Sequence, residues 1–147
     1  MKIIAIASAG GHWIQLQRIM PAFQNTEVVF VSTKSSFRDL VPENKFYSVR
    51  DFNRNNKGFI IPVLFQLFQI IIIERPHCII TTGAAPGLIA LVLGKLLFRK
   101  TIWLDSIANV KELSMSGRIA AHFADRVYTQ WPSLATKKVI YAGNVLS

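Results

Sequence analysis

Apolar positions along the chain form short runs typical of buried strands, separated by longer stretches with helical spacing. The short runs predict strands at 2–8, 27–32, 45–49, 77–82, 100–105, 126–130 and 138–143. The longer stretches predict helices at 12–23, 35–41, 59–74, 86–98 and 116–124, with serine caps opening the second and Pro86 in the first turn of the fourth. Strands with continuous apolar residues are buried on both faces. The alternation therefore predicts an α/β fold, a doubly wound parallel sheet covered by helices.

Composition adds an unusual pairing of positive charge with apolarity. The 147 residues include 17 Lys and Arg against 8 Asp and Glu, a net charge of +9, and 51% of them are hydrophobic. The length fits a single domain spanning 1–147, because no internal repeat or linker interrupts it. A basic and apolar chain favours an anionic partner beside an apolar surface, such as a membrane face. No Arg-rich tract, zinc-ligand spacing or aromatic RNA-binding motif supports a nucleic-acid partner.

The N-terminus and the single cysteine indicate the compartment. The opening run reaches Gly10 before a secretory signal can form, so the protein is expected to stay in the cytoplasm. Cys78 lies in an apolar run, where it is expected to be a core residue, and it allows no internal disulfide. No metal site or cofactor is expected.

The longest apolar stretch, Phe59–Ile73, is shorter than the roughly 20 residues that span a bilayer. Two interpretations remain for it, a buried helix or an in-plane contact with the membrane surface. In the second, basic residues lie at headgroup level and aromatic residues enter the lipid. This would place the protein peripherally on the inner face of the cell membrane. The predicted membrane contacts are Arg50, Arg54, Lys57, Phe59, Phe65 and Phe68.

Two loops of small residues follow the first and fourth predicted strands. If the strand order is 3-2-1-4-5, the loops Ser8–His12 and Thr81–Gly87 flank one crevice at the carboxyl ends of the strands. Each precedes a helix whose N-terminal amides attract phosphate or carboxylate. The chain lacks a G-x-G-x-x-G motif, a P-loop and the acidic residue that holds an adenosine ribose. A free-standing nucleotide-binding oxidoreductase is therefore disfavoured.

Two side chains at this edge are candidate general bases. His12 opens a helix at the mouth of the crevice, where an imidazole can take a proton from a sugar hydroxyl, cap the helix or bind phosphate. Asp105 ends a predicted strand at the same edge, where it can orient a sugar hydroxyl, act as the base, hold a partner's cation or cap a helix. Trp131 is a candidate for sugar stacking, a subunit contact or core packing. Surface or packing roles are expected for His77 and His122.

Four segments together resemble one known family. They are "SAGGH", "TTGAAPG", "IWLDSIANVKELSMSGRIAAHFADRVYTQWPSLA" and "YAGNV". The chain is similar in these segments to the asparagine-linked-glycosylation-fourteen family, and among bacterial relatives it resembles the PssD-type half-transferases of capsule and exopolysaccharide synthesis. The resemblance implies a Rossmann-like domain equivalent to the N-terminal half of a GT-B glycosyltransferase.

The resemblance implies that this chain is one half of an enzyme made of two polypeptides. This half binds a polyprenyl-pyrophosphate-linked acceptor at the membrane, and a separate donor-binding subunit supplies the UDP-sugar at the subunit interface. The chain is then expected to be inactive alone. In GT-B enzymes of the MurG type a "GNP" turn closes the N-terminal domain, and "YAGNVLS" stands at the corresponding place with Val145 for proline. The alternative is a non-catalytic membrane adaptor that activates a complete glycosyltransferase.

Site residues carry over only where the motifs align. The resemblance implies a catalytic role for His12, and Asp105 with Ser106 matches the acidic-Ser pair of the family. His12 and Asp105 both remain candidates for the base. The motifs that align include Gly10, Gly11, Thr82, Gly83, Ala84, Pro86, Gly87 and Ser106, and these residues are expected to bind substrate. Ser8 and Asn109 lie in the same loops and are predicted to bind substrate with them. The resemblance implies contact with the partner or the sugar for Gln130, Trp131 and Pro132.

Overall fold

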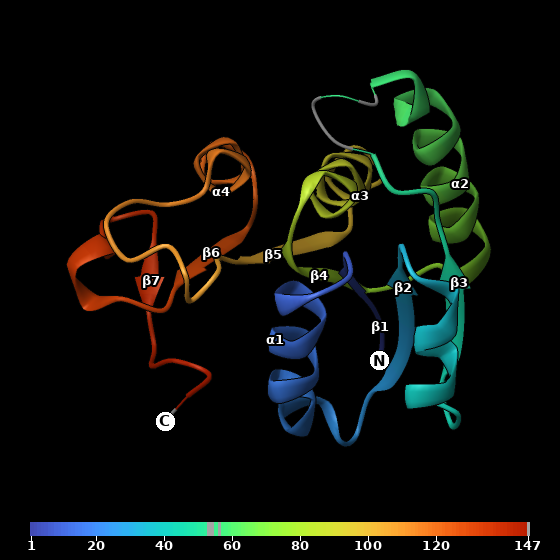
Figure 1. The fold of residues 1–147 in the computed structure, drawn as a ribbon, viewed down its shortest axis with the longest axis horizontal. Helices are drawn as coiled ribbons and strands as arrows, with labels where there is room; N and C mark the ends of the chain where they lie inside the picture. The colour runs from blue at the N-terminus through green and yellow to red at the C-terminus, as the bar shows by residue number, and fades with distance from the viewer. Residues whose placement is uncertain (53–54, 56, 147) are drawn as a thin grey trace.

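A parallel β-sheet runs through the molecule in a computed structural model that describes residues 1–52, 55 and 57–146. Within these residues the sheet has seven strands in the order β3-β2-β1-β4-β5-β6-β7 (Figure 1). This confirms the predicted order 3-2-1-4-5 and extends it by two strands. The strands are β1 (Lys2–Ala7), β2 (Glu27–Ser32), β3 (Lys45–Ser48), β4 (Cys78–Gly83), β5 (Lys100–Leu104), β6 (Arg126–Thr129) and β7 (Ile140–Tyr141).

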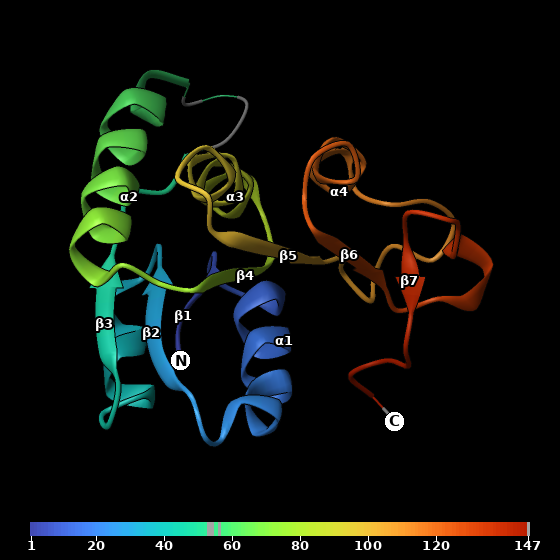
Figure 2. The ribbon, with the colours of Figure 1, turned by 180° about the vertical axis from the view of Figure 1, so that it is seen from behind.

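The helices divide unequally between the two faces of the sheet, as Figures 1 and 2 show. One face carries α2 (Ile60–Glu74), α3 (Ala85–Leu96) and α4 (Met115–Ala120). The other carries α1 (Gly11–Ile19) and the 3₁₀ segments η1 (Met20–Phe23) and η2 (Ser35–Leu40). Two further 3₁₀ turns are η3 (Lys57–Phe59) and η4 (Pro132–Leu134). The predicted α/β fold is therefore confirmed.

Three predicted elements differ from the structure. Segment 35–40 is a 3₁₀ helix whose N-cap is Lys34, with no side-chain cap bond, so the predicted serine caps are wrong. The helix predicted at 116–124 ends at Ala120, and Ser114 caps it by accepting a hydrogen bond from Gly117. The last strand covers only Ile140–Tyr141. Short elements depend on a few local hydrogen bonds, which apolar spacing does not report.

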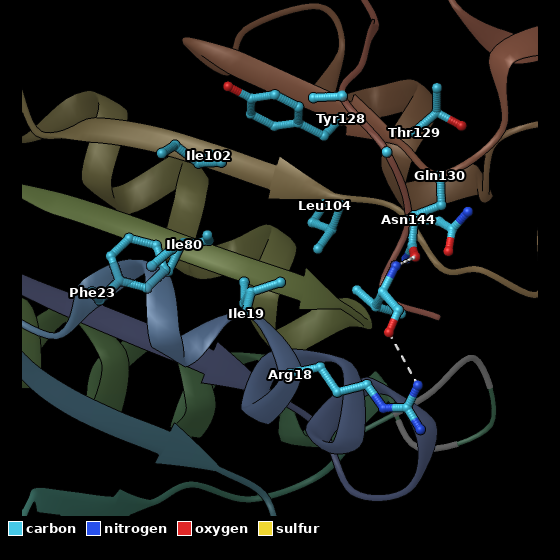
Figure 3. A pocket seen from close by; sticks show the side chains of 14 residues that line it. Arg18, Ile19, Phe23, Ile80, Ile102, Leu104, Tyr128, Thr129, Gln130 and Asn144 are labelled. Atoms are coloured by element: carbon cyan, nitrogen blue, oxygen red, sulfur yellow. Dashed lines mark hydrogen bonds between the residues drawn. The ribbon is translucent and has the colours of Figure 1, made fainter. Parts of the chain in front are cut away.

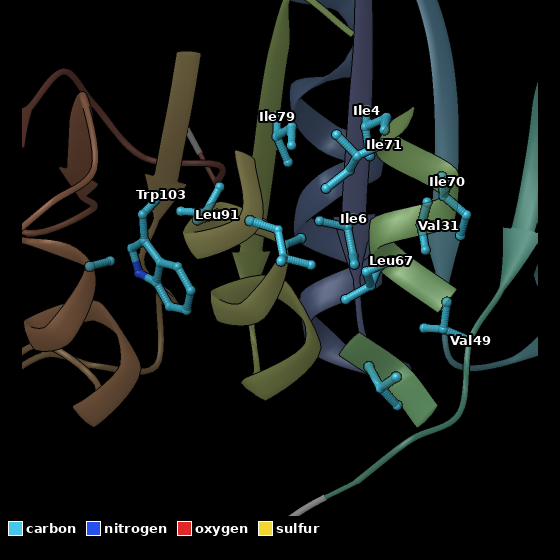
Figure 4. Close-up of a cluster of buried hydrophobic side chains, with 14 of the residues drawn as sticks. Ile4, Ile6, Val31, Val49, Leu67, Ile70, Ile71, Ile79, Leu91 and Trp103 are labelled. Atoms are coloured by element: carbon cyan, nitrogen blue, oxygen red, sulfur yellow. The ribbon is translucent and has the colours of Figure 1, made fainter. Parts of the chain in front are cut away.

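The sheet is buried on both faces because its central strands are apolar at consecutive positions. Alternate side chains of β1 enter different clusters: Ile4 and Ile6 pack under α2 and α3, whereas Ile3 and Ala5 pack under α1. Figure 4 shows the larger cluster, in which Leu67 and Ile71 of α2 and Leu91 of α3 meet the sheet. Trp13 of α1 anchors the other cluster by stacking on Phe37 at 4.7 Å between ring centroids.

Cover on the α1 face is incomplete. Among the described residues, α1 and η2 pack over the sheet's β1–β3 side, and the cluster beneath them includes Ile80 of β4. Ile102 of β5 and Tyr128 of β6 are only partly buried and line a cavity of about 470 Å³ on this face (Figure 3). An apolar sheet surface is thus left open beside α1.

Candidate functional site

His12 and Thr82 join the two predicted loops by a reciprocal pair of hydrogen bonds. The Nδ1 atom of His12 lies 2.9 Å from the Thr82 carbonyl oxygen, and the Thr82 hydroxyl donates to the His12 carbonyl oxygen at 2.6 Å. Because a carbonyl only accepts, Nδ1 carries the hydrogen. In the neutral imidazole Nε2 is then the acceptor. The loops predicted to face each other therefore meet, and they fix one tautomer of His12.

Backbone conformation brings the second loop directly beneath the His12 ring. Gly83 has φ +138°, and a Cβ added there would lie 2.4 Å from Cε1 of His12. Ala84 follows with φ 66° and ψ 178°, a region that is essentially confined to glycine. Gly10, at the N-cap of α1, has φ +84°. Gly10 thus allows the backbone turn before α1, and Gly83 leaves room for the His12 ring.

A cavity of about 290 Å³ opens beside His12. One wall comes from the first two turns of α1, the other from the loop after β5, and the C-terminal segment closes the rim. It is lined by Gly11, His12, Ile14, Gln15, Arg18, Ser106, Ile107, Ala108, Val145 and Leu146. The structure thus brings three predicted site residues, Gly11, His12 and Ser106, to one cavity. Among the described residues, no group of three or more His, Cys, Asp or Glu is placed to hold a metal.

The second loop supports this cavity rather than lining it. Thr82, Gly83, Pro86 and Gly87 are buried, and a Cβ on Gly87 would lie 2.1 Å from the Thr81 hydroxyl. None of them lines the cavity beside His12, and their binding of the acceptor stays a prediction. The lack of a side chain at Gly87 allows helix α3 to approach Thr81 of β4 closely.

Asp105 is a buried organiser of the loop after β5, and this corrects its prediction as an accessible base. The side chain belongs to a residue that is 1% exposed. One carboxylate oxygen accepts from Trp103 Nε1 at 2.9 Å and from the Ser114 hydroxyl at 2.6 Å. The other accepts from the Asn109 side-chain amide and the Ser114 backbone amide, both at 3.0 Å. Asn109, predicted to bind substrate, therefore turns inward as well.

Two buried glutamines hold the walls of the cavity together. The Gln15 side-chain oxygen accepts from the Ile107 amide at 2.8 Å and from Gln130 Nε2 at 2.6 Å. Gln130 also donates to the Asp105 carbonyl, and its own oxygen accepts from the Val145 amide at 3.0 Å. Gln130 is 1% exposed, which corrects its prediction as a partner or sugar contact. The sequence reasoning missed Gln15, although its i, i+3 spacing from His12 places both on one helix face.

The remaining residues of the predicted "QWP" contact lie at the surface. Trp131 is partly buried and donates from Nε1 to the Ile107 carbonyl at 2.8 Å, and Pro132 is exposed. Ser8 is buried at the end of β1.

His77 and His122 are exposed, as predicted. Burial raises the pKa of the Cys78 thiol to about 11, which fits the predicted packing role.

The C-terminal segment separates two cavities. Val145 and Arg18 line both the 290 Å³ cavity beside His12 and the 470 Å³ cavity on the open sheet face. An Arg18 Nη1 hydrogen bond to the Val145 carbonyl, 3.1 Å long, fastens the segment to α1 (Figure 3). Apolar side chains line much of the larger cavity, including Phe23, Ile80 and Leu104.

Helix α2 is apolar on its exposed face as well as on its buried face. Val63, Leu67, Ile70 and Ile71 point into the core. Its outer face exposes Ile61 (73%), Leu64, Phe65 (63%), Phe68, Ile72 and Ile73. The helical segment Lys57–Glu74 is long and apolar enough, by length and composition alone, to cross a membrane. Its inner face packs on the sheet, which confirms the buried-helix alternative for that half of the helix, and contact of the outer half with a membrane stays a prediction.

The other predicted membrane contacts lie around the start of α2. Phe59 is exposed at its N-cap, and the Arg50 guanidinium lies 5.4 Å from the centre of the Phe59 ring. Lys57 is exposed beside it. Arg54 lies outside the described residues.

At the opposite edge of the sheet a carboxylate is buried among cations. Glu74, at the end of α2, accepts from Lys45 Nζ at 2.8 Å, from Lys2 Nζ at 3.1 Å and from the Tyr47 hydroxyl. Burial alone would raise the pKa of the Glu74 carboxyl. The hydrogen bonds from Lys45, Tyr47 and Lys2 outweigh burial and lower the pKa to about 2. This network ties β1, β3 and α2 together far from His12.

The fold class is matched by solved structures of nucleotide-sugar enzymes. MurG from Acinetobacter baumannii aligns with a TM-score of 0.80 and 11% identity, over 97% of this chain and 46% of that chain. A UDP-GlcNAc 2-epimerase from Methanocaldococcus jannaschii aligns with a TM-score of 0.72 and 12% identity, over 98% and 46%. At these identities the likeness shows the fold alone. The domain thus has the architecture of one half of a GT-B-type enzyme.

Sequence relatives identify the family. The family model described as "Oligosaccharide biosynthesis protein Alg14 like" matches residues 57–145, more than half of the chain. The Schizosaccharomyces pombe UDP-N-acetylglucosamine transferase subunit alg14 is 49% identical over 35% of this chain and 23% of its own length. The human ALG14 subunit is 36% identical over 54% and 40%. The chain belongs to the Alg14 family. It spans well under half the length of these two relatives.

Proposed function

We propose that this chain is the acceptor-binding, membrane-associated subunit of a two-subunit glycosyltransferase. A separate donor-binding chain would present a UDP-sugar, and the acceptor would be a saccharide on polyprenyl pyrophosphate. The observation that carries the proposal is His12. Its Nδ1 is held by Thr82, and its ring lies at a cavity between α1 and the loop after β5. Membership of the Alg14 family and the GT-B-type fold support the same reaction class.

His12 is the general base of the proposed reaction. Nε2 takes the proton from the acceptor hydroxyl while that oxygen forms a bond to C1 of the donor sugar. The bond between C1 and the phosphate oxygen breaks, and UDP leaves with the electron pair. Attack from the side opposite UDP inverts C1. The Thr82 carbonyl, which accepts from Nδ1–H, stabilises the imidazolium formed in this step.

Positive potential at the cavity suits phosphate groups of donor or acceptor. The amides in the first turn of α1 point toward its N-terminus at Gly11 and His12. Arg18 adds a permanent cation to the same cavity wall. Asp105 is assigned a positioning role, because its carboxylate already accepts four hydrogen bonds from the loop that forms the opposite wall.

The partner chain is assigned to the open sheet face beside α1. The surface around Ile80, Ile102 and Tyr128 is apolar, and no helix among the described residues covers it. A chain seated there would touch Val145, which also lines the cavity beside His12. The donor would thereby be brought to the edge of the sheet where the acceptor binds.

The outer face of α2 is assigned to the membrane. Contiguous exposed apolar side chains on a monomer mark an interaction surface. Arg50 and Lys57 beside them suit anionic headgroups. A lipid-linked acceptor then reaches the cavity along the bilayer surface.

The test is transfer by the reconstituted pair. The chain is co-expressed with a donor-binding partner and assayed with a panel of UDP-sugars, beginning with UDP-N-acetylglucosamine, against lipid-linked saccharides. We expect transfer only when both chains are present. His12→Ala should lower kcat by about 10²- to 10⁴-fold with the pair still assembled.

The matched control is His122→Ala, which removes an exposed histidine far from the cavity and should leave the rate unchanged. A His12→Ala pair that transfers sugar at the wild-type rate would contradict the catalytic role. A partner that transfers sugar fully on its own would favour the adaptor function instead.

A further inference from the structure

The turn after α3 places a phenylalanine where helices favour glycine. The Phe98 amide donates to the Lys95 carbonyl at 3.1 Å, and the Arg99 amide donates to the Gly94 carbonyl at 2.8 Å. These two bonds form a Schellman motif, whose C′ residue adopts the left-handed conformation. Phe98 occupies that position with φ +59°. A Cβ strains this conformation, and a large side chain is rare there.

Within the described residues, the Phe98 ring is not buried and so gains little from packing to offset this strain. Phe98 is 96% exposed, the highest value among the large apolar side chains that the structure describes, and Leu96 beside it is 69% exposed. In water the ring therefore costs hydration free energy as well as backbone strain. Transfer of the ring into an apolar phase outside the chain would remove the cost of hydration.

The surroundings of Phe98 are strongly basic. Lys95, Arg99 and Lys100 flank it in sequence. Asp125 is the acidic neighbour of this turn, and it is bonded to Lys95 Nζ at 2.7 Å. A shallow cavity of about 330 Å³ next to Asp125 is lined by further cations, namely Arg126, Lys137 and Lys138. An apolar tip among cations is complementary to an anionic bilayer, which offers acyl chains and negative headgroups together.

The turn after α3 lies on the side of the sheet where α2 and α3 expose apolar side chains. Helix α3 packs beside α2 on one face of the sheet (Figure 2). Val92 and Leu96, one turn apart on α3, are exposed like the outer residues of α2. The turn lies at the amino ends of the strands, opposite the edge that carries His12.

We infer that the α3–β5 turn is a second membrane contact, in which the Phe98 ring enters an anionic bilayer and the flanking cations lie at the headgroups. This inference rests on the proposed membrane association, and it adds an anchor distinct from α2. Contacts at two separate places would fix the orientation of the domain, whereas contact along a single helix permits rotation about its axis.

The substitution Phe98→Gly in the full chain tests the anchor, because binding and stability should change in opposite directions. Co-sedimentation with vesicles of mixed anionic and zwitterionic phospholipid should weaken about tenfold or more, since the ring no longer leaves water. The thermal midpoint should rise, since glycine relieves the left-handed strain. A higher midpoint with unchanged vesicle binding would overturn the inference.

Two further variants sharpen the result. Leu40→Ala removes an exposed apolar side chain from η2 on the other face of the sheet and should leave vesicle binding unchanged. Phe98→Trp keeps an aromatic anchor, so binding should persist. The emission that this variant adds to that of the wild-type chain, which already has three tryptophans, should shift to the blue on anionic vesicles but much less on zwitterionic ones. Absence of a blue shift on anionic vesicles would also overturn the inference.

Transferase activity separates this inference from the proposed reaction. With a detergent-soluble acceptor, the reconstituted pair carrying Phe98→Gly should retain wild-type kcat. If no pair transfers sugar but vesicle binding still depends on Phe98, the reaction is refuted and the anchor stands. If the pair is active and vesicle binding ignores Phe98, the anchor is refuted and the reaction stands.

Discussion

The two edges of the sheet are held together by different chemistry. At the carboxyl edge, Asp105 and the Gln15–Gln130 pair are satisfied by neutral donors such as amides, hydroxyls and an indole. At the amino edge, Glu74 is surrounded by Lys2 and Lys45. The Asp105 carboxylate accepts its hydrogen bonds from uncharged donors, whereas the Glu74 carboxylate is paired with two lysines. The two edges therefore differ in the charge of the donors that surround their buried carboxylates.

The largest effect is expected when the hydrogen bonds accepted by Asp105 are removed. Asp105→Ala should lower the free energy of unfolding by about 3–5 kcal/mol, because Trp103 Nε1 and the Ser114 amide would lose their acceptor inside the protein. Urea unfolding measures the loss. Asp39→Ala, at an exposed carboxylate on η2, is the control and should change stability by less than about 0.5 kcal/mol. Wild-type stability of Asp105→Ala would restore Asp105 as a candidate base.

The stability contributed by the Glu74 ion pairs should depend on pH. A carboxyl pKa lowered from 4.5 to about 2 contributes roughly 3 kcal/mol of stability, which is fully present above pH about 4.5 and is lost as pH falls toward 2. Glu74→Gln should remove most of this contribution at neutral pH and flatten the acid limb of the stability curve. Glu112→Gln, in an exposed pair with Arg118, should cost at most about 1 kcal/mol. An unaltered acid limb in Glu74→Gln would contradict the assignment.

A smaller effect on stability, with a clear effect on catalysis, is expected at Gly83. The added methyl of Gly83→Ala would meet the His12 ring and would also sit at φ +138°. We expect a loss of about 1–3 kcal/mol in stability. We also expect a fall in kcat of the reconstituted pair, because the ring must move from its place over the loop. Ala9→Gly, in the same loop as His12 but at an exposed position, is the control. A Gly83→Ala pair with wild-type kcat would show that the ring position is not critical.

The smallest expected effect separates the two bonds between His12 and Thr82. Thr82→Val removes the hydroxyl that donates to the His12 carbonyl and keeps the Thr82 carbonyl that accepts from Nδ1. Stability should fall by about 1 kcal/mol. The pH dependence of kcat should be retained, because the tautomer is unchanged. A shifted pH profile would mean that the hydroxyl also acts on the imidazole.

Much of the fold could be predicted because it depends on local patterns. Continuous apolar runs such as 27–32 identify buried strands, and the apolar periodicity of 86–98 identifies a helix. The loops Ser8–His12 and Thr81–Gly87 could be predicted to face each other, because neighbouring parallel strands have their carboxyl ends at the same edge of the sheet. His12 was found in this way, since it opens a helix at that edge.

The roles of individual polar residues were less predictable. Asp105 appears at the same edge in the sequence, yet only the conformation of the following loop decides whether its oxygens face solvent or Ser114. Gln130 and Gln15 meet across a separation of 115 residues, which no local pattern reports. The exposed outer face of α2 is likewise invisible in a stretch that is apolar all round.

The separation between bonded residues also has a consequence for how the protein is made. His12 meets Thr82 across 70 residues, and the Gln15–Gln130 bond spans still more of the chain. Closing such long loops is entropically costly and slow compared with forming a helix. The cavity beside His12 is complete only when α1, the loop after β5 and the C-terminal segment have come together, because all three line it.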